Sequence, residues 1–599
     1  MSARSVFATL AGLMLLAAAA VAPAASHPPP RPDPNKVLRY VFMVSETGFD
    51  PALVTDYFSN VVVEAIFEPL LTYDYLARPA RLAGRAAEVP PAVEDGGRRY
   101  TFRIRPGIRF ADDPAFKGQA RELTAQDYAY AIRRLLDPQV RSPWRYLVEG
   151  KIAGLDAIAK AAEKSGRYDY DAPVAGLATP DRHTLVITLN APDYNFPYIL
   201  AMPNLGAVAR EVIEQYAGQT NAHPVGTGPY RLARWVRSSR LELEANPHYR
   251  GHVWDFAPVE PGDEKLVSEM RGKVLPTVGR VEIAIIEEDQ ARLLAFQRGE
   301  LDLFSLEGTL APRVLNGDQF TPEFVKLGAK LSRIVQPEIL THYFSLRDPV
   351  LGGLSKEKIA LRRAMAMAYD VQEEIRVLRN GQAIELHYPV PPGVIGHLPG
   401  YRSRNATDVK LANALLDRFG YKVGADGYRT LPDGKPLAVR YTSRPDSAGR
   451  EADELWKKTL DKIKIRLVSD KRKFPDILQA EKSCRIAMRT MSWLADYPDG
   501  ENFMSLFYSK NIGQSNHACV DLPEYDALYE QAARLPPGPE RDALWVDMAR
   551  LLEVYGVHRM NIARYRNMVL QERVLGYKKH PIMHTEWLYI DIDDKGKRP

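Results

Sequence analysis

Two pairs of histidines have the spacing of zinc ligands on a helix. His248 and His252, and likewise His580 and His584, are four residues apart, so a helix would place each pair on one face. Pro581 interrupts the second pair, and the first pair lies in an Asn-Pro-His-Tyr turn. We therefore interpret all four histidines as structural and expect no metal site.

Other short motifs also lack the partners that chemistry would need. The glycines of 226–230 resemble a phosphate-binding loop, but no helix with a lysine follows, so we predict a structural turn. Residues 591–596 resemble the start of a calcium loop without its glutamate at position 12. The sequence contains no Gly-x-Ser-x-Gly, His-Glu-x-x-His or Gly-x-x-x-x-Gly-Lys motif. We expect no catalytic residues and no cofactor, and hence no enzyme.

The composition is that of a large globular protein. Its 599 residues exceed what one compact core holds, so several domains are expected. Hydrophobic residues make up 45% of the chain and charged residues 26%, which excludes global disorder. The net charge is only +5 and no block of like charges occurs, so nucleic acid is not an expected partner.

The N-terminus has the pattern of a cleavable signal peptide. Arg4 is followed by an uncharged apolar stretch at 6–21 and then by small residues at 22–24. We assign residues 1–25 to the signal peptide, although the apolar stretch approaches the length of a membrane anchor. Lipid attachment would need a cysteine at the cleavage point, and both cysteines lie far downstream. We therefore expect a freely diffusing periplasmic protein that is not a lipoprotein.

The two cysteines, Cys484 and Cys519, allow two interpretations. In an oxidising compartment they could form one disulfide, which would stabilise the fold by about 3–4 kcal/mol through loop-closure entropy. Two separate buried thiols are the alternative, and the sequence does not decide between them.

Strand and helix patterns interleave along the chain. Short apolar or alternating runs predict strands at 38–44, 100–104, 184–189 and 281–286. Thr124 and Ser355 are predicted to cap helices that end near residues 137 and 370, and 61–71 predicts a helix followed by a turn. Because no repeat of 20–50 residues occurs, we expect a mixed α/β fold class.

Beyond these elements, a series of short motifs spans most of the chain. Among them are Asn-Pro-His-Tyr-Arg-Gly at 246–251 and Trp-Leu-Ala-Asp-Tyr-Pro-Asp at 493–499. Others lie at 67–71, 100–110, 123–127, 224–230, 298–302, 362–366, 432–434 and 502–503. In this order they resemble the extracellular solute-binding proteins, family 5, which serve oligopeptide and dipeptide importers. The resemblance runs from residue 38 to about 590 and departs only in a lengthened loop at 111–122.

The resemblance implies a two-lobed periplasmic binding protein of mixed α/β class, with an extra subdomain and a ligand cleft between the lobes. Residues 286–565 would form lobe 2. The implied parts of lobe 1 are 26–51, 179–285 and 566–599, with 52–178 as the added subdomain. The implied function is the peptide-capturing component of an ABC importer, a monomer that delivers its ligand to a permease with ATPase subunits.

Asp496 is the residue for which the resemblance is most specific. In peptide-binding relatives the aspartate of a Trp-x-x-Asp motif accepts the ligand's α-ammonium group, and this segment matches that motif. A closed cleft excludes water, so a buried ammonium needs a fixed carboxylate. The alternative is a carboxylate that caps a turn, since Asp499 is close by. Trp493 and Tyr497 are expected either as walls of the site or as core.

Two further segments are expected to pair with the ligand through main-chain groups, as in strand addition. They are Glu46, Thr47 and Gly48 after the first strand, and Tyr343, Phe344 and Ser345. In relatives that bind longer peptides, an arginine lies six residues before the aspartate, where this chain has Thr490 and Arg489 is one residue off. A non-peptide ligand such as haem, an opine, a sugar or a metal chelate therefore stays an alternative. A periplasmic hydrolase or chaperone is the other class.

Overall fold

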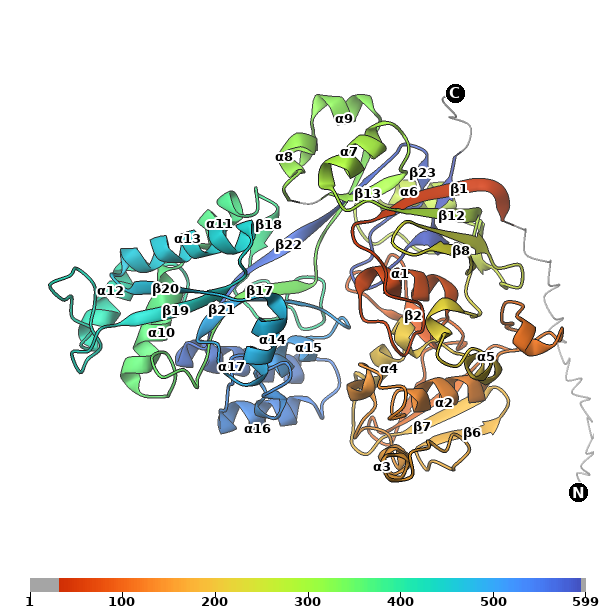
Figure 1. Cartoon of the computed structure of the whole chain (residues 1–599), viewed down its shortest axis with the longest axis horizontal. Coiled ribbons are helices and arrows are strands. Elements are labelled where there is room, and N and C mark those ends of the chain that lie inside the picture. Colours follow the sequence, from red (N-terminus) through yellow and green to blue (C-terminus); the bar gives the residue numbers. More distant parts are fainter. Residues whose placement is uncertain (1–31, 307, 594–599) are drawn as a thin grey trace, which may run out of the picture.

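The computed structural model describes residues 32–306 and 308–593, and Figure 1 shows that they form two lobes. The signal peptide predicted at 1–25 lies outside the described residues. Within the described part, no helix combines the length and the apolar character needed to cross a membrane. Helices and strands interleave in both lobes, which confirms the predicted mixed α/β class.

Lobe 1 is built on a sheet whose central strand is buried. The strands are, in order, β1 (Asp33–Phe42), β12 (Val278–Ile285), β9 (Arg240–Ala245) and β8 (Tyr230–Val236). In β12, Val281 and Ile283 are fully buried and alternate with half-buried residues, as a sheet with one covered face requires. Helix α1 (Tyr57–Ile66) packs Val61 and Val62 into the same core.

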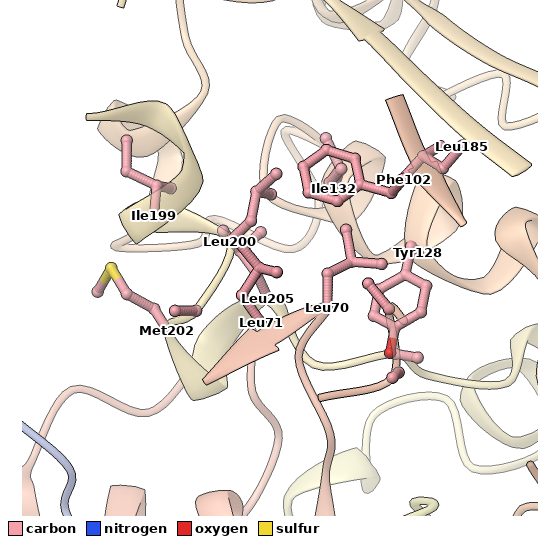
Figure 2. Packing of buried hydrophobic residues seen from close by; sticks show 14 of the residues in the cluster. Leu70, Leu71, Phe102, Tyr128, Ile132, Leu185, Ile199, Leu200, Met202 and Leu205 are labelled. Atoms are coloured by element: carbon pink, nitrogen blue, oxygen red, sulfur yellow. The ribbon is translucent and has the colours of Figure 1, made fainter. Parts of the chain in front are cut away.

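A smaller sheet and two helices form the subdomain of lobe 1. Its elements are β4 (Ala92–Glu94), β5 (Arg99–Arg103), β7 (Thr184–Thr188), β6 (Leu177–Asp181), α2 (Ala125–Arg134) and α3 (Leu155–Ser165). Phe102, Ile132 and Leu185 pack together from three of these elements (Figure 2). Leu200 and Met202 belong to the same buried cluster, so this core also fixes the loop that carries them.

Lobe 2 contains a second, larger sheet. Its strands are, in order, β22 (His558–Leu570), β17 (Glu338–Phe344), β21 (Met488–Leu494), β19 (Ala438–Ser443) and β20 (Arg466–Lys471), with β18 (Ala383–Glu385) also on β22. The helices are α10 (Lys356–Ala368), α11 (Val371–Val377), α12 (Val409–Arg418), α13 (Ser447–Lys462), α14 (Phe474–Lys482), α15 (Glu501–Met504), α16 (Pro523–Ala532) and α17 (Pro539–Tyr555). Trp456 and Trp545 are fully buried and anchor the helices on the two sides of the sheet in separate clusters.

Two chain crossings connect the lobes. One is the link from β16 (Lys330–Val335) to β17, and the other is β22, which runs from one lobe into the other (Figure 1). The first half of β22 pairs with β17 and β18, and its second half pairs with β13 (Leu303–Leu306) and β16. Gln336 N donates to Arg564 O at 2.8 Å, so the two crossings are hydrogen-bonded to each other.

The segment between β12 and β16 packs on lobe 1. It contains α7 (Asp289–Gln297), α8 (Ala311–Val314) and α9 (Pro322–Lys326), and Figure 1 shows these helices beside β13. Phe296 and Phe304 share a core cluster with Val41 of β1, and Arg39 N donates to Asp302 Oδ2 at 2.7 Å. We therefore propose that lobe 2 begins near residue 336 rather than at 286. The pairing of β5 with β7 likewise extends the proposed subdomain past residue 178.

Most elements predicted from the sequence are present, with shifted ends. The strands predicted at 100–104, 184–189 and 281–286 are β5, β7 and β12, whereas the strand predicted at 38–44 begins earlier, at Asp33. Ser355 caps α10 through Lys358 N at 3.4 Å, and this helix ends at Ala368 because Asp370 caps α11 instead. Helix α2 begins directly after Thr124, whose N–H donates to Asp127 Oδ2 at 2.7 Å.

The two cysteines form a disulfide. Cys484 follows α14, Cys519 precedes α16, and their Cα atoms are 6.1 Å apart. The bond closes a segment with a sequence separation of 35 residues. This segment contains β21 and the residues that follow it toward the other lobe, so the disulfide restrains the part of lobe 2 described next.

Candidate functional site

A cavity of about 420 Å³ lies between the two lobes. Lobe 2 contributes Leu494, Ala495 and Asp496, and the crossing from β16 to β17 contributes Ile334 and Gln336. Residues on the opposite wall, from lobe 1, include Met43, Tyr57, Phe58, Glu64, Trp144, Met202, Lys579, Met583 and His584. A molecule in this cavity would contact both lobes and both ends of the first crossing.

The end of β21 positions Asp496. Leu494 is opposite Glu338 in the last pair of the β17–β21 ladder, and Ala495 N still donates to Pro337 O at 2.9 Å. Beyond this bond the chain leaves the sheet. Asp496 N then donates to Asn502 Oδ1 at 3.1 Å, and Asn502 Nδ2 donates back to Asp496 Oδ2 at 3.1 Å. The buried amide of Asn502 therefore fixes the backbone and the carboxylate of Asp496 together.

The carboxylate of Asp496 is suited to accept a cation. Burial raises its pKa, and the hydrogen bond from Asn502 and the nearby His584 partly oppose that rise. Among the described residues, no hydrogen bond uses its Oδ1. A carboxylate held in a low-dielectric crevice with one oxygen uncommitted forms strong charge-assisted hydrogen bonds with an ammonium group. The turn-capping alternative does not describe these contacts, because the cap is made by Asp499, whose Oδ1 accepts from Glu501 N at 3.0 Å.

The charged groups of lobe 1 at this cavity are engaged within lobe 1. Lys579 Nζ donates to Glu586 at 2.6 Å, and both side chains are buried. Glu64 Oε2 accepts from the backbone N–H of His584 at 2.7 Å. Arg566 lies over the ring of Tyr57, 5.3 Å from its centroid. Most of the remaining lobe 1 lining is apolar, with Thr55, Asn60 and Asn204 as neutral polar residues, so Asp496 is the charge that lobe 2 brings to a mostly apolar surface.

A second, larger cavity of about 840 Å³ adjoins the first. Both are lined by Gln336 and Arg566, which lie on the two crossings. Its other lining residues are mainly polar and include Gln382, Tyr441, Thr442, Ser443, Arg489, Thr490 and Asn567. Tyr441 and Thr490 are hydrogen-bonded at 2.9 Å, and Thr490 Oγ1 donates to or accepts from His342 Nδ1 at 2.8 Å. An extended ligand could therefore occupy both cavities, with different surroundings at its two ends.

Trp493 and Tyr497 flank Asp496 but do not line the 420 Å³ cavity. Trp493 packs against a core cluster of lobe 2 and donates Nε1–H to Asn502 Oδ1 at 3.1 Å. Tyr497 stacks on Tyr198 of lobe 1, with ring centroids 6.4 Å apart, and its hydroxyl donates to Glu501. Of the two alternatives left open for these aromatics, Trp493 is on the core side and Tyr497 lies in a contact between lobes.

The loop after β1 is tied to lobe 1 and lines neither cavity. Glu46 is buried and accepts from Trp235 Nε1 at 2.5 Å, and Thr47 N donates to Ser59 Oγ at 2.9 Å. Gly48 packs so closely on Asn221 that a Cβ there would lie 2.5 Å from it. These contacts give the loop a packing role. Met43, which precedes these residues in the chain, does line the cavity.

The second segment expected at the ligand is core. Tyr343, Phe344 and Ser345 are all buried, and none lines either cavity. Tyr343 donates its hydroxyl to Glu481 Oε1 at 2.9 Å, and Ser345 N donates to Ala487 O at 2.8 Å. Strand β17 is flanked by β21 and β22, so its main-chain groups are already paired and cannot receive an added strand.

Sequence reasoning missed three kinds of site residue. Asn502 lies in the short motif at 502–503, and only its contacts reveal that it holds Asp496. The methionines of the apolar wall come from distant segments and have no local pattern. His584, interpreted as structural, lines the cavity beside Glu64. Within the described residues, no group of three or more side chains could hold a metal ion.

The lobes also meet outside the cavities. Asn195 Nδ2 of lobe 1 donates to Asp499 Oδ1 of lobe 2 at 3.2 Å, and both residues are buried. Arg541 Nη2 contacts the other oxygen of Asp499 at 2.7 Å. Burial raises the pKa of Asp499 to about 6, although Arg541 opposes the rise. These contacts describe lobes that are closed on each other.

Comparison with known proteins gives consistent matches over nearly the whole chain. The oligopeptide-binding protein OppA of Bacillus subtilis is 26% identical over 490 residues, covering 80% of this chain and 79% of that protein. Di/tripeptide-binding protein 2 of Pseudomonas aeruginosa is 25% identical over 603 residues, covering 94% and 97%. Among solved structures, the periplasmic binding protein DppA from Helicobacter pylori in complex with peptide STSA has a TM-score of 0.69 at 19% identity, covering 93% and 98%.

The comparison with protein families agrees with these matches. Residues 81–515 match the family described as "Bacterial extracellular solute-binding proteins, family 5 Middle". The match contains Asp496, Asn502 and most residues of the second cavity, and it spans more than half of the chain. The chain belongs to the bacterial extracellular solute-binding proteins of family 5.

Proposed function

We propose that this protein captures a peptide between its two lobes and hands it to the permease of an ABC importer. Asp496 accepts the α-ammonium group of the peptide in the 420 Å³ cavity. The observation that carries the proposal is the uncommitted Oδ1 of a half-buried carboxylate at a cavity between lobes. A charge-assisted bond there is shielded from water when lobe 1 closes over it, so closure strengthens recognition.

A peptide is the favoured solute because of the relatives. Two of them are named for oligopeptides and for di- and tripeptides, and the Helicobacter pylori structure contains a bound peptide. As a member of a solute-binding family, the protein is a binding protein and not an enzyme. The proposed setting is the periplasm, with residues 1–25 removed on export and the mature protein acting as a monomer without a lipid anchor.

Isothermal titration of a tripeptide and its N-acetylated form tests this proposal. Acetylation removes the ammonium charge, and Asp496→Asn removes the carboxylate. Breaking a buried charge pair costs about 3–5 kcal/mol, so each change alone should weaken binding by at least about 100-fold. The exposed Asp521 provides a matched control, because Asp521→Asn removes one carboxylate from the same lobe away from the cavities.

Two outcomes would contradict the proposal at different levels. Equal affinity for free and acetylated peptide would remove the role of Asp496. A screen in which no peptide shifts the thermal transition, while haem, a sugar or a metal chelate does, would remove the peptide and keep the family. A ligand at 100 times its Kd should stabilise the folded protein by about 2.7 kcal/mol, which a thermal shift detects.

A further inference from the structure

Methionine and aromatic side chains form a large part of the cavity wall that lobe 1 contributes. Its apolar residues come from five separate parts of lobe 1 and from the first crossing. They include Met43, Phe58, Trp144, Met202, Ile334 and Met583. Met202 and Met583 are almost completely buried, and Met202 belongs to the subdomain core in Figure 2. This wall is therefore a fixed part of the folded lobe, and a ligand does not have to assemble it.

Two charged side chains of the same wall, Lys579 and Glu64, already have partners within lobe 1. Lys579 is held by Glu586 and by Met583 O at 2.8 Å, and Glu64 accepts two backbone N–H groups, from His584 and Thr585. A charged or amide side chain pressed against the methionine and aromatic part of this surface would lose its hydration without gaining hydrogen bonds, which costs binding free energy. An apolar side chain would gain free energy by the same transfer.

The second cavity has the opposite character. Hydroxyl and amide groups line it, among them Tyr441, Thr490 and Gln382. Because Gln336 and Arg566 line both cavities, a ligand held at Asp496 can continue from the apolar cavity into the polar one. One extended ligand would therefore have mostly apolar surroundings at the end near Asp496 and mainly polar surroundings at its other end.

We propose that the first residue of the bound peptide carries a bulky apolar side chain, which lies against the methionine and aromatic wall opposite Asp496. The proposal rests on the peptide-binding function inferred above and adds a specificity to it. Methionine side chains are flexible and polarizable and adapt to several shapes. The cavity therefore selects a class of first residues, with leucine, methionine and phenylalanine all accepted, and leaves later positions to the polar cavity.

A series of tripeptides Xaa-Ala-Ala tests the proposal by isothermal titration with the full mature protein. Leucine, methionine and phenylalanine are compared with asparagine, glutamine and lysine, so that leucine and asparagine form a nearly isosteric pair. We expect the apolar first residues to bind at least about tenfold more tightly than the polar ones. Affinities equal within threefold across the series would overturn the inference while leaving the peptide-binding function intact. No binding by any member would instead count against the function itself.

A variant of the wall gives an independent readout. Met43→Glu places a carboxylate in the apolar wall, and we expect it to weaken Leu-Ala-Ala and to strengthen Lys-Ala-Ala, so that their affinity ratio falls at least tenfold. Val44→Glu is the matched control, because Val44 is the next residue, is 49% exposed and does not line the cavity. If Met43→Glu folds and the ratio of the affinities for Leu-Ala-Ala and Lys-Ala-Ala is unchanged, the inference is overturned. If the variant does not fold, the tripeptide series on the native protein decides the question.

Discussion

Asn502 holds Asp496 through two hydrogen bonds that run in opposite directions. Its Oδ1 accepts the backbone N–H of Asp496, and its Nδ2 donates to the carboxylate Oδ2, each at 3.1 Å. The same Oδ1 accepts the indole N–H of Trp493. Asn502 is only 4% exposed, so its amide is shielded from bulk water. It is a positioning residue that stabilises the ionised form of Asp496 and fixes its direction.

Replacing Asn502 by leucine should therefore change the pH dependence of binding. The bond from Nδ2 lowers the pKa of Asp496 against the effect of burial, so its loss raises that pKa further. Ammonium binding requires the ionised carboxylate and is lost as pH falls through its pKa. In Asn502→Leu we expect the midpoint of this loss to move to higher pH and the affinity at pH 7 to fall about tenfold. Titrations of a tripeptide between pH 4 and 8 measure both.

Asn516 provides the comparison for that experiment. It is fully buried, and its Nδ2 donates to Tyr508 O and Val520 O away from the cavities. Asn516→Leu should lower stability without moving the pH midpoint. If both variants move the midpoint equally, or neither does, Asn502 has only a structural role.

The contact between Asn195 and Asp499 should stabilise the closed form selectively. The two residues are on different lobes, so their 3.2 Å hydrogen bond is lost when the lobes separate. A hydrogen bond to a charged group contributes about 1.5–3 kcal/mol. Asn195→Ala should therefore weaken ligand binding by about tenfold or more, although Asn195 does not line either cavity near Asp496. Small-angle scattering should show a larger radius of gyration for this variant than for the native protein. Asn190→Ala, which removes an amide bonded within lobe 1, should do neither.

Asp499 should also make stability depend on pH. Its pKa rises in the folded protein from the ordinary 3.8 to about 6, so the folded state binds a proton more readily than the unfolded state between these values. The resulting stabilisation is fully present below pH 3.8 and is lost as pH rises through about 6. Asp499→Asn does not titrate there. The difference in unfolding free energy, native protein minus variant, should therefore fall by about 2 kcal/mol between pH 4 and 7.5. Urea denaturation at both pH values measures it, and a constant difference would contradict the assignment.

Removal of the disulfide should lower stability more than affinity. The bond between Cys484 and Cys519 restrains the unfolded chain, and its loss should cost about 3–4 kcal/mol through loop-closure entropy. Asp496 lies inside the closed segment but is positioned by Asn502 and β17, which remain. Urea titrations of the native protein with and without reductant test this, and the double serine variant should be insensitive to reductant. A large loss of affinity in the folded variant would show that the disulfide shapes the site.

Local patterns in the sequence predicted the helices and strands well, whereas the lobe boundary depends on contacts between distant segments. Ser355 and Thr124 precede their helices and bond to residues three positions later, so the starts of these helices can be predicted from adjacent residues. The packing of Phe296 on Val41 joins segments more than 250 residues apart in sequence, and no local pattern predicts it. The expected division placed the segment 286–334 in lobe 2, and from this packing we propose its assignment to lobe 1.

The candidate site shows the same limit. The resemblance selected Asp496, which lines the cavity between lobes, and this agrees with an ammonium-binding role that stays a prediction. It also selected Tyr343, whose strand has β21 and β22 on its two sides and no free edge. Whether a strand is central or at an edge depends on the order of strands in the sheet, which the residues of one strand do not encode. The wall of Met43, Met202 and Met583 likewise arises only in three dimensions.

The core of lobe 1 contains residues from both ends of the chain, so it can be completed only after lobe 2 has been synthesised. Leu38 of β1 shares its core with Trp587 and Ile592, and Lys36 pairs with Asp591 at 2.5 Å. The buried residues of both lobe 2 clusters come from 339–563. Lobe 2 can therefore finish its core before the C-terminal residues that complete the core around β1 have been synthesised. A truncation that stops after residue 570 would leave lobe 1 open, and such a chain would present the bare face of β1 to proteases and chaperones.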